Sequence, residues 1–277
     1  MEEIDKISTE ISEGITDIEI DYYSRKLAVG TPTGKIYVYD NFSNILTKPP
    51  ELSAHIGPVY KLSWSNPSFG VLASGGFDKK VNIITYNNQL NGNIIYNHEL
   101  HENCVTCLKF SPSNKNLLLI SGDLNGNIIS SEYSKDKNDF ITNKIFGHDF
   151  GVNSIDFLTD DKFITCGNDN RLKIWNYTEE NGINIIKCEQ ELKNENNLTI
   201  KDLSCKDDKH FVCCGSNEGE SLILYWILNE KNIWEAHEIY RNEGNLEKIR
   251  FNEEHTCIVV VDDKGKEILL KEDELSL

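Results

Sequence analysis

The sequence predicts an all-β fold, a β-propeller of six repeated units, and three observations support this prediction. Histidines recur about every 46 residues, at His55, His101 and His148, and a valine follows each of them four residues later. Further along each repeat, a Ser or Thr is followed after four residues by an Asp or Asn. Apolar runs are of strand length, proline is scarce and no helical periodicity persists. A unit this small cannot bury a core alone, so neighbouring units must stack.

A period of roughly 40–45 residues with four short strands is typical of one blade of a WD-repeat propeller. We expect six blades in a single domain over residues 1–277, at about 15–46, 55–90, 98–133, 145–177, 198–233 and 246–271. In the first blade, Leu27–Gly30 and Ile36–Tyr39 flank a Thr33-Gly34 turn, which is a hairpin signal. In the second, Val71–Gly76 and Val81–Ile84 flank a turn at Asp78.

The later blades follow the same plan with decreasing clarity. The third and fourth repeat the His-to-Asp spacing, and the fourth ends in the run 172–175, Leu-Lys-Ile-Trp. In the fifth, Phe211–Gly215 precedes Leu222–Ile227, and in the sixth, Cys257–Val261 precedes Ile268–Leu270. Polar stretches between the blades, for example Ser134–Asn143, are expected to be solvated loops.

Composition excludes several classes of function. The formal charge of −17 is spread along the chain. Phosphate backbones and anionic lipids attract Lys/Arg clusters, so direct nucleic-acid binding and membrane insertion are disfavoured, whereas a basic partner protein is not. No segment approaches the roughly 20 apolar residues that span a bilayer, and the N-terminus lacks an apolar signal core. We therefore expect a cytoplasmic protein whose eight cysteines stay reduced.

Residues 54–64 read Ala-His-Ile-Gly-Pro-Val-Tyr-Lys-Leu-Ser-Trp. This run resembles the second blade of the Sec-thirteen family of WD-repeat proteins. The triplet Asp21-Tyr22-Tyr23 and the run 151–154, Gly-Val-Asn-Ser, agree as well. The chain departs from the family in its fifth blade, which opens with 195–198, Glu-Asn-Asn-Leu, and by keeping the Trp that closes the third strand in one blade, at Trp175. It resembles a reduced, divergent member.

The resemblance implies a structural role. The family forms the outer cage of the COPII coat in ER-to-Golgi transport and belongs to the nuclear pore Y-complex. Its propeller is open, and a partner inserts a seventh blade between blades one and six. The implied partner is a Sec-thirty-one-type cage subunit or a helical Y-complex nucleoporin, at ER exit sites and COPII vesicles or at the nuclear pore. The Seh-type propeller of the same pore complex is an alternative.

The recurring polar residues have a catalytic and a structural interpretation. A nucleophilic triad occurs once in an enzyme, whereas this set recurs, so we interpret it as a hydrogen-bond network that satisfies buried polar groups. We assign no catalytic residue and no cofactor. The predicted structural network comprises His55, Ser74, Asp78, His101, Ser121, Asn125, His148, Thr165, Asp169 and Trp175.

A zinc site is a second chemical alternative. His98, His101, Cys104 and Cys107 have spacings that zinc ligands use. Side chains alternate faces along a strand, so Cys104 and Cys107 are expected to point in opposite directions. We therefore predict no metal site.

Three function classes follow from these observations. We favour a scaffold subunit that binds its partner by β-augmentation at the two ends of the chain, because unpaired strand edges recruit further strands. A WD-repeat adaptor that holds peptides on one face of a closed ring is an alternative, and an enzyme is disfavoured. The predicted partner interface comprises Ile18, Ile20, Ile36, Val38, Ile258, Val260, Ile268 and Leu270.

Overall fold

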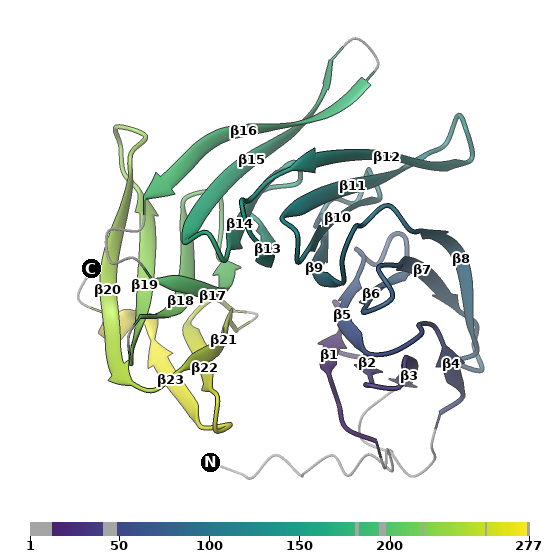
Figure 1. Ribbon diagram of the computed structural model, residues 1–277, viewed down its shortest axis with the longest axis horizontal. Helices are drawn as coiled ribbons and strands as arrows, with labels where there is room; N and C mark the ends of the chain where they lie inside the picture. Colours follow the sequence, from purple (N-terminus) through teal and green to yellow (C-terminus); the bar gives the residue numbers. More distant parts are fainter. Residues whose placement is uncertain are drawn as a thin grey trace. The chain divides into compact units, whose positions relative to one another are not determined.

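The structure is a computed structural model that describes residues 13–40, 49–180, 183–193, 198–217, 219–252 and 254–275. Within these ranges the chain forms 23 strands in six antiparallel sheets and one short 3-10 helix, Glu272–Glu274 (Figure 1). Five sheets have four strands and the last has three. No helix in the described part of the chain is long and apolar enough to cross a membrane.

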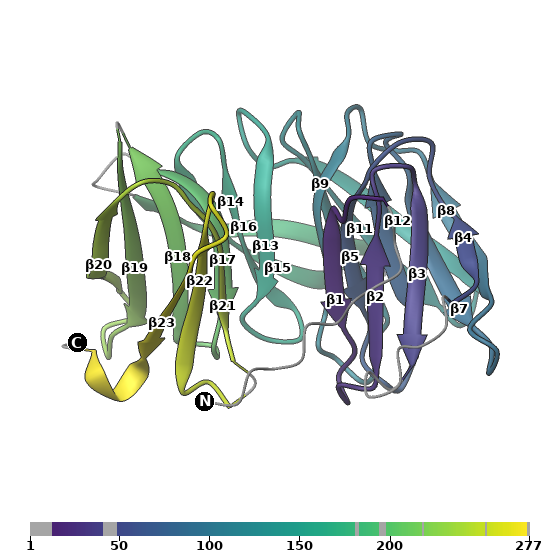
Figure 2. The same ribbon diagram turned by 90° about the horizontal axis from the view of Figure 1, so that it is seen from below.

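The sheets follow one another along the chain, and strands consecutive in sequence pair within each. The first three sheets contain β1 (Asp17–Ile20), β2 (Lys26–Gly30), β3 (Lys35–Asp40), β4 (Glu51–Ser53); β5 (Val59–Trp64), β6 (Leu72–Gly76), β7 (Val81–Tyr86), β8 (Gly92–His98); and β9 (Val105–Phe110), β10 (Leu118–Asp123), β11 (Asn127–Ser134), β12 (Asp139–Phe146). The last three contain β13 (Val152–Phe157), β14 (Lys162–Gly167), β15 (Arg171–Glu180), β16 (Ile183–Lys193); β17 (Thr199–Cys205), β18 (His210–Asn217), β19 (Glu220–Leu228), β20 (Trp234–Glu243); and β21 (Leu246–Phe251), β22 (Cys257–Asp262), β23 (Glu267–Lys271). Figure 2 shows β1, β2 and β3 side by side in alternating directions.

The chain divides into two compact units, and each has its core between successive sheets. The first unit comprises residues 1–123 and 131–142, and the second comprises 124–130 and 143–277. In the first unit, Ile36 of one sheet packs with Leu72 of the next, and Ile83 packs with Leu119 of the third. In the second unit, Cys213 lies in a cluster with residues of β14 and β15, and Cys214 lies in one with residues of β21 and β22. Middle strands are therefore buried on both faces, which explains their unbroken apolar runs.

The fourth strands correct the predicted blade ends. The stretch expected to be a loop, Ser134–Asn143, contains most of the outer strand β12 (Asp139–Phe146). The other four outer strands, β4, β8, β16 and β20, lie beyond the predicted ends of their blades. These strands have one solvated face; β8, for example, alternates between exposed and partly buried residues. Their polar composition resembles that of a loop, while backbone pairing with the third strand defines them as strands.

Candidate functional site

The second repeat joins its polar residues into one hydrogen-bond network. His55, in the connection from β4 to β5, has Nε2 2.8 Å from Oγ of Ser74 on β6. Its Nδ1 lies 2.8 Å from Oδ1 of Asp78 in the β6–β7 turn, and the backbone N–H of Ile56 donates to Oδ2 of Asp78 at 3.0 Å. An ionised carboxylate only accepts, so Nδ1 of His55 is the donor to Asp78.

The fourth repeat contains the longest version of this network. Nε1 of Trp175 donates to Oγ1 of Thr165 at 2.8 Å, and Oγ1 of Thr165 lies 2.7 Å from Nε2 of His148. Nδ1 of His148 lies 2.9 Å from Asp169, which also accepts the backbone N–H of Asp149 at 3.1 Å. His148 and Thr165 are fully buried, so this chain of bonds satisfies polar groups that water does not reach.

The third repeat differs from the prediction at one position. His101 lies 2.8 Å from Ser121, as its spacing predicts, but the carboxylate 3.2 Å from its Nδ1 belongs to Asp123 and not to the side chain of Asn125. The register between the first two strands shifts at the same place in the second, third and fourth repeats, and Asp123 stands where the other two have Gly76 and Gly167. Asp123 is fully buried, whereas the aspartates of the other two repeats sit in the turn. A side chain at this strand position points at the histidine Nδ1, so Asp123 supplies the carboxylate that the spacing assigned to Asn125, and the assignment is corrected.

The charges in these networks are set by burial and by hydrogen bonds. Burial lowers the pKa of His55, which favours the neutral ring. Burial by itself raises the pKa of Asp78, but bonds from the Ile56 N–H and from His55 outweigh it and the pKa is lowered. At Asp169 the bonds from His148 and from the backbone outweigh burial in the same way and lower the pKa. In the second and fourth repeats the networks thus hold ionised carboxylates that fix a loop to a turn, and the repetition of the set argues against a single activated nucleophile.

A second set of polar contacts, between neighbouring sheets, was not predicted. Asp17 accepts the backbone N–H of Leu62 at 2.9 Å, and Asp156 accepts that of Cys205 at 2.8 Å. Asp202, which is 1% exposed, accepts the backbone N–H of Ile249 at 3.1 Å. Each aspartate lies on the first strand of its sheet and bonds the first strand of the next. The three strands mix polar and apolar residues, so their composition does not distinguish these aspartates from solvated ones.

The four residues of the predicted zinc alternative have different surroundings in the structure. His101 belongs to the network described above, and His98 is buried at the end of β8 with neither ring nitrogen hydrogen-bonded. Cys107 is buried on β9, whereas Cys104 precedes that strand and is half-buried. Across the described ranges, no three His, Cys, Asp or Glu side chains form a group that could hold a metal ion.

The end strands place the predicted interface residues on different faces. Ile18 and Ile20 are 55% and 50% exposed on β1. Ile36, Val38, Ile258 and Val260 are fully buried, and Ile268 and Leu270 pack against the cluster of Ile258 and Val260. The four buried side chains cannot contact a partner, and this part of the predicted interface is corrected.

The alternation of the strands identifies which apolar side chains of the end sheets are exposed instead. In the first sheet, Ile18 pairs with Val29 and Ile20 with Leu27, so these four side chains share the face opposite Ile36. In the last sheet, Val259 pairs with Leu269, on the face opposite Ile258. Leu269 is 61% exposed and Val259 is half-buried. The end sheets therefore expose Ile18 and Ile20 in the first and Leu269 in the last, whereas Leu27 and Val29, on the same face as Ile18, are buried with Tyr37 and Tyr39.

Trp175 and Trp226 pack between strands, and the position of Trp226 corrects one further prediction. Trp175 stacks on Phe163 with 6.3 Å between ring centroids, and Trp226 stacks on Phe211 at 5.6 Å. Both pairs join the second and third strands of a sheet at equivalent register positions. The fifth repeat thus also keeps a tryptophan on its third strand, although its equivalent of Thr165 is Cys213.

Comparison with known proteins agrees with this architecture. The family described as WD domain, G-beta repeat matches residues 92–129 and 140–176. Together with the six sheets and the recurring networks, this match defines the protein as a six-bladed WD-repeat β-propeller, and the predicted fold class is confirmed. The protein transport protein SEC13-2 of Candida glabrata is 30% identical over 83% of this chain and 82% of its own length. The SEC13 homolog of Caenorhabditis briggsae is 31% identical over 80% of this chain and 76% of its own. The chain belongs to the Sec-thirteen family, as the resemblance indicated.

A solved structure supports the fold alone. A chain in the crystal structure of a mitotic checkpoint complex superposes with a TM-score of 0.73 at 14% sequence identity. The match covers 95% of this chain and 79% of the other.

Proposed function

We propose that this protein is a structural scaffold subunit of the COPII outer cage, of the nuclear pore Y-complex, or of both, and that it binds a large helical partner that supplies an additional blade. Its place would be cytoplasmic, peripheral at ER exit sites and COPII vesicles or at the nuclear pore. The proposal extends what family membership supports, namely a role in protein transport, and it assigns no catalytic activity.

The observation that carries the proposal is the three-stranded last sheet. In the described ranges no strand pairs with the outer edge of β23, whereas the other five sheets each have a fourth strand. An unpaired edge offers N–H and C=O groups to a further strand. The exposed side chain of Leu269 lies on β23 itself, so a partner strand or blade at this sheet would also bury apolar surface.

Affinity purification of the full-length tagged chain tests this proposal. We expect one large helical protein to co-purify in a fixed ratio. Leu269→Glu and Ile18→Glu should each reduce its recovery, because each replaces an exposed apolar side chain of an end sheet by a charge. Phe146→Glu is the matched control, since Phe146 is 65% exposed on β12, a strand of the third sheet. Recovery of a stable monomer with no such partner would contradict the proposal, and imaging of the tagged chain distinguishes the coat from the pore.

A further inference from the structure

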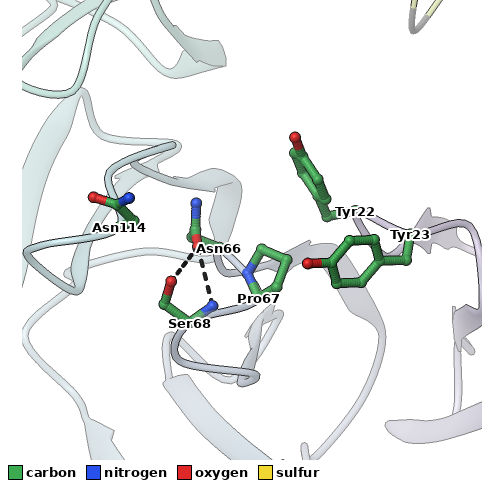
Figure 3. Close-up of a pocket in the computed structure, with 6 residues that line it drawn as sticks. All are labelled: Tyr22, Tyr23, Asn66, Pro67, Ser68 and Asn114. Atoms are coloured by element: carbon green, nitrogen blue, oxygen red, sulfur yellow. Dashed lines mark hydrogen bonds between the residues drawn. The ribbon is translucent and has the colours of Figure 1, made fainter.

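The first unit contains a surface hollow at the end of its sheets that lies opposite the histidine networks. Its volume is about 420 Å³, and it is lined by Tyr22, Tyr23, Asn66, Pro67, Ser68 and Asn114 (Figure 3). The two tyrosines come from the β1–β2 turn, and the other residues come from the β5–β6 and β9–β10 turns. The tyrosines belong to the triplet that begins at Asp21, to which neither the packing nor the proposed function gives a role.

Hydrogen bonds hold the turns around the hollow in fixed conformations. The carboxylate of Asp21 accepts the backbone N–H groups of Arg25 at 2.6 Å and Lys26 at 2.8 Å. Oδ1 of Asn66 accepts from the backbone and the hydroxyl of Ser68, and its Nδ2 donates to the carbonyl of Pro112 in the next turn at 2.9 Å. A ligand would therefore meet a surface that is already ordered, which lowers the entropy cost of binding.

The tyrosines are presented to solvent and not packed into the core. Tyr22 is 72% exposed and Tyr23 is 59% exposed, and their rings meet edge to face with 5.3 Å between centroids. Figure 3 shows the Tyr23 ring extending toward Pro67. Among the described residues, neither tyrosine hydroxyl nor the Asn114 amide has a hydrogen-bond partner. Apolar ring surface and free donors thus line the same hollow.

These features fit one class of ligand. A polyproline II segment presents apolar proline rings, and its backbone carbonyls are unpaired because the conformation has no internal hydrogen bonds. Aromatic-lined grooves bind such segments through ring packing and donors to those carbonyls. The charged group beside the rings is Arg25, whose guanidinium lies 5.5 Å from the centroid of Tyr23 and forms no ion pair with the described residues. That unpaired cation is complementary to an acidic side chain.

We propose that this hollow binds a proline-rich peptide segment that carries an acidic residue next to its prolines. The prolines pack against Tyr22, Tyr23 and Pro67, the tyrosine hydroxyls and Asn114 donate to peptide carbonyls, and Arg25 pairs with the acidic residue. The site is independent of the exposed apolar side chains of the end sheets, so it stands or falls separately from the proposed function.

Fluorescence polarisation with the full-length protein tests the site. The probe is a labelled synthetic hexapeptide, Pro-Pro-Pro-Glu-Pro-Pro, compared with peptides in which Ala replaces Pro or Lys replaces Glu. We expect a Kd of roughly 10–500 μM for the probe, and at least about tenfold weaker binding of the Ala peptide. Absence of saturable binding up to about 1 mM, or equal binding of the Ala peptide, would overturn the proposal.

Variants of the protein locate the binding. Tyr22→Ala with Tyr23→Ala should weaken the probe at least about tenfold, since two ring contacts are lost. Phe146→Ala, an equally exposed aromatic on β12, should leave the affinity unchanged. Arg25→Gln should abolish the preference for Glu over Lys in the peptide while the fold, checked by circular dichroism, is kept. Equal binding by the tyrosine variant, or a Glu preference that survives Arg25→Gln, would overturn the assignment.

Discussion

The carboxylate of Asp202 on β17 lies 2.6 Å from Nη1 of Arg250, which lies on β21, the first strand of the next sheet. Asp202 is buried, and it also accepts from the hydroxyl of Ser154 at 2.6 Å and from the backbone of Ile249. One carboxylate on β17 therefore bonds to β13 and β21. A buried charge is tolerated when it is paired and hydrogen-bonded, and here its partners lie on the preceding and the following sheet.

Removing this carboxylate should destabilise the second unit. We expect Asp202→Ala to lower the free energy of unfolding by about 2–4 kcal/mol, because the Ile249 N–H and the Ser154 hydroxyl lose their acceptor. Urea denaturation followed by tryptophan fluorescence measures the change. Asp208→Ala is the control, because Asp208 is exposed, and it should change stability by no more than about 0.5 kcal/mol. Equal effects of the two substitutions would contradict the proposed importance of these inter-sheet bonds.

Acid should destabilise the protein through His98. Burial lowers the pKa of His98 to about 4, and the neighbouring His101 adds to the shift. The unfolded state, with an ordinary histidine pKa of about 6.5, then binds a proton that the folded state does not. Stability therefore falls as the pH decreases from about 6.5 to 4, by about 3 kcal/mol from this group alone.

Substitution of His98 separates this effect from those of other groups. His98→Leu removes two buried nitrogens that have no hydrogen-bond partner, so the variant should lose less stability between pH 6.5 and 4.5 by about 2–3 kcal/mol. Ile95→Gln, at an exposed and non-titrating position of the same strand β8, should keep the wild-type slope. Denaturation curves at several pH values give the slopes, and parallel slopes for wild type and His98→Leu would rule this origin out.

The sequence was sufficient to predict the repeats because their signals are local. The His spacing and the Ser or Thr that follows report a hydrogen-bonded unit, and the structure brings His55, Ser74 and Asp78 together. Asn125 was misassigned because the third repeat has Asp123 at the strand position where Gly76 and Gly167 stand, and a spacing rule does not consider a carboxylate two residues before the turn position.

The end-sheet faces were predicted less well for a related reason. Ile36 and Val38 alternate with Tyr37 and Tyr39, and both faces of β3 are apolar. Composition therefore did not distinguish the face that packs on the second sheet from the opposite one. The outer strands were missed because one side of each is solvated, so the polar residues of a strand such as β12 resembled those of a loop.

A tight turn in the first sheet should not tolerate a side chain. Gly34 has φ +85°, and a Cβ there would lie 2.0 Å from the carbonyl oxygen of His55. Gly34→Ala should therefore cost about 3 kcal/mol or more, whereas Gly265→Ala, at φ +77° with no atom within 4 Å, should cost only about 1 kcal/mol. Thermal denaturation measures both losses of stability. The loss in Gly265→Ala reports the strain of the positive φ alone, and the excess in Gly34→Ala reports the steric clash. Similar losses in both would indicate that the turn relaxes around the new methyl group.

The hydrogen bond of Trp175 can be measured against an internal reference. Trp175 and Trp226 occupy equivalent positions and stack on Phe163 and Phe211, but only Trp175 donates to a hydroxyl, because Cys213 stands where Thr165 does in the other sheet. Replacement of either tryptophan by Phe removes a similar volume of buried ring. Trp175→Phe also leaves Thr165 without its donor, so it should destabilise the protein by about 1 kcal/mol more than Trp226→Phe. In the Thr165→Val background both replacements should cost the same, and a difference that persists there would assign the excess to packing and not to the network.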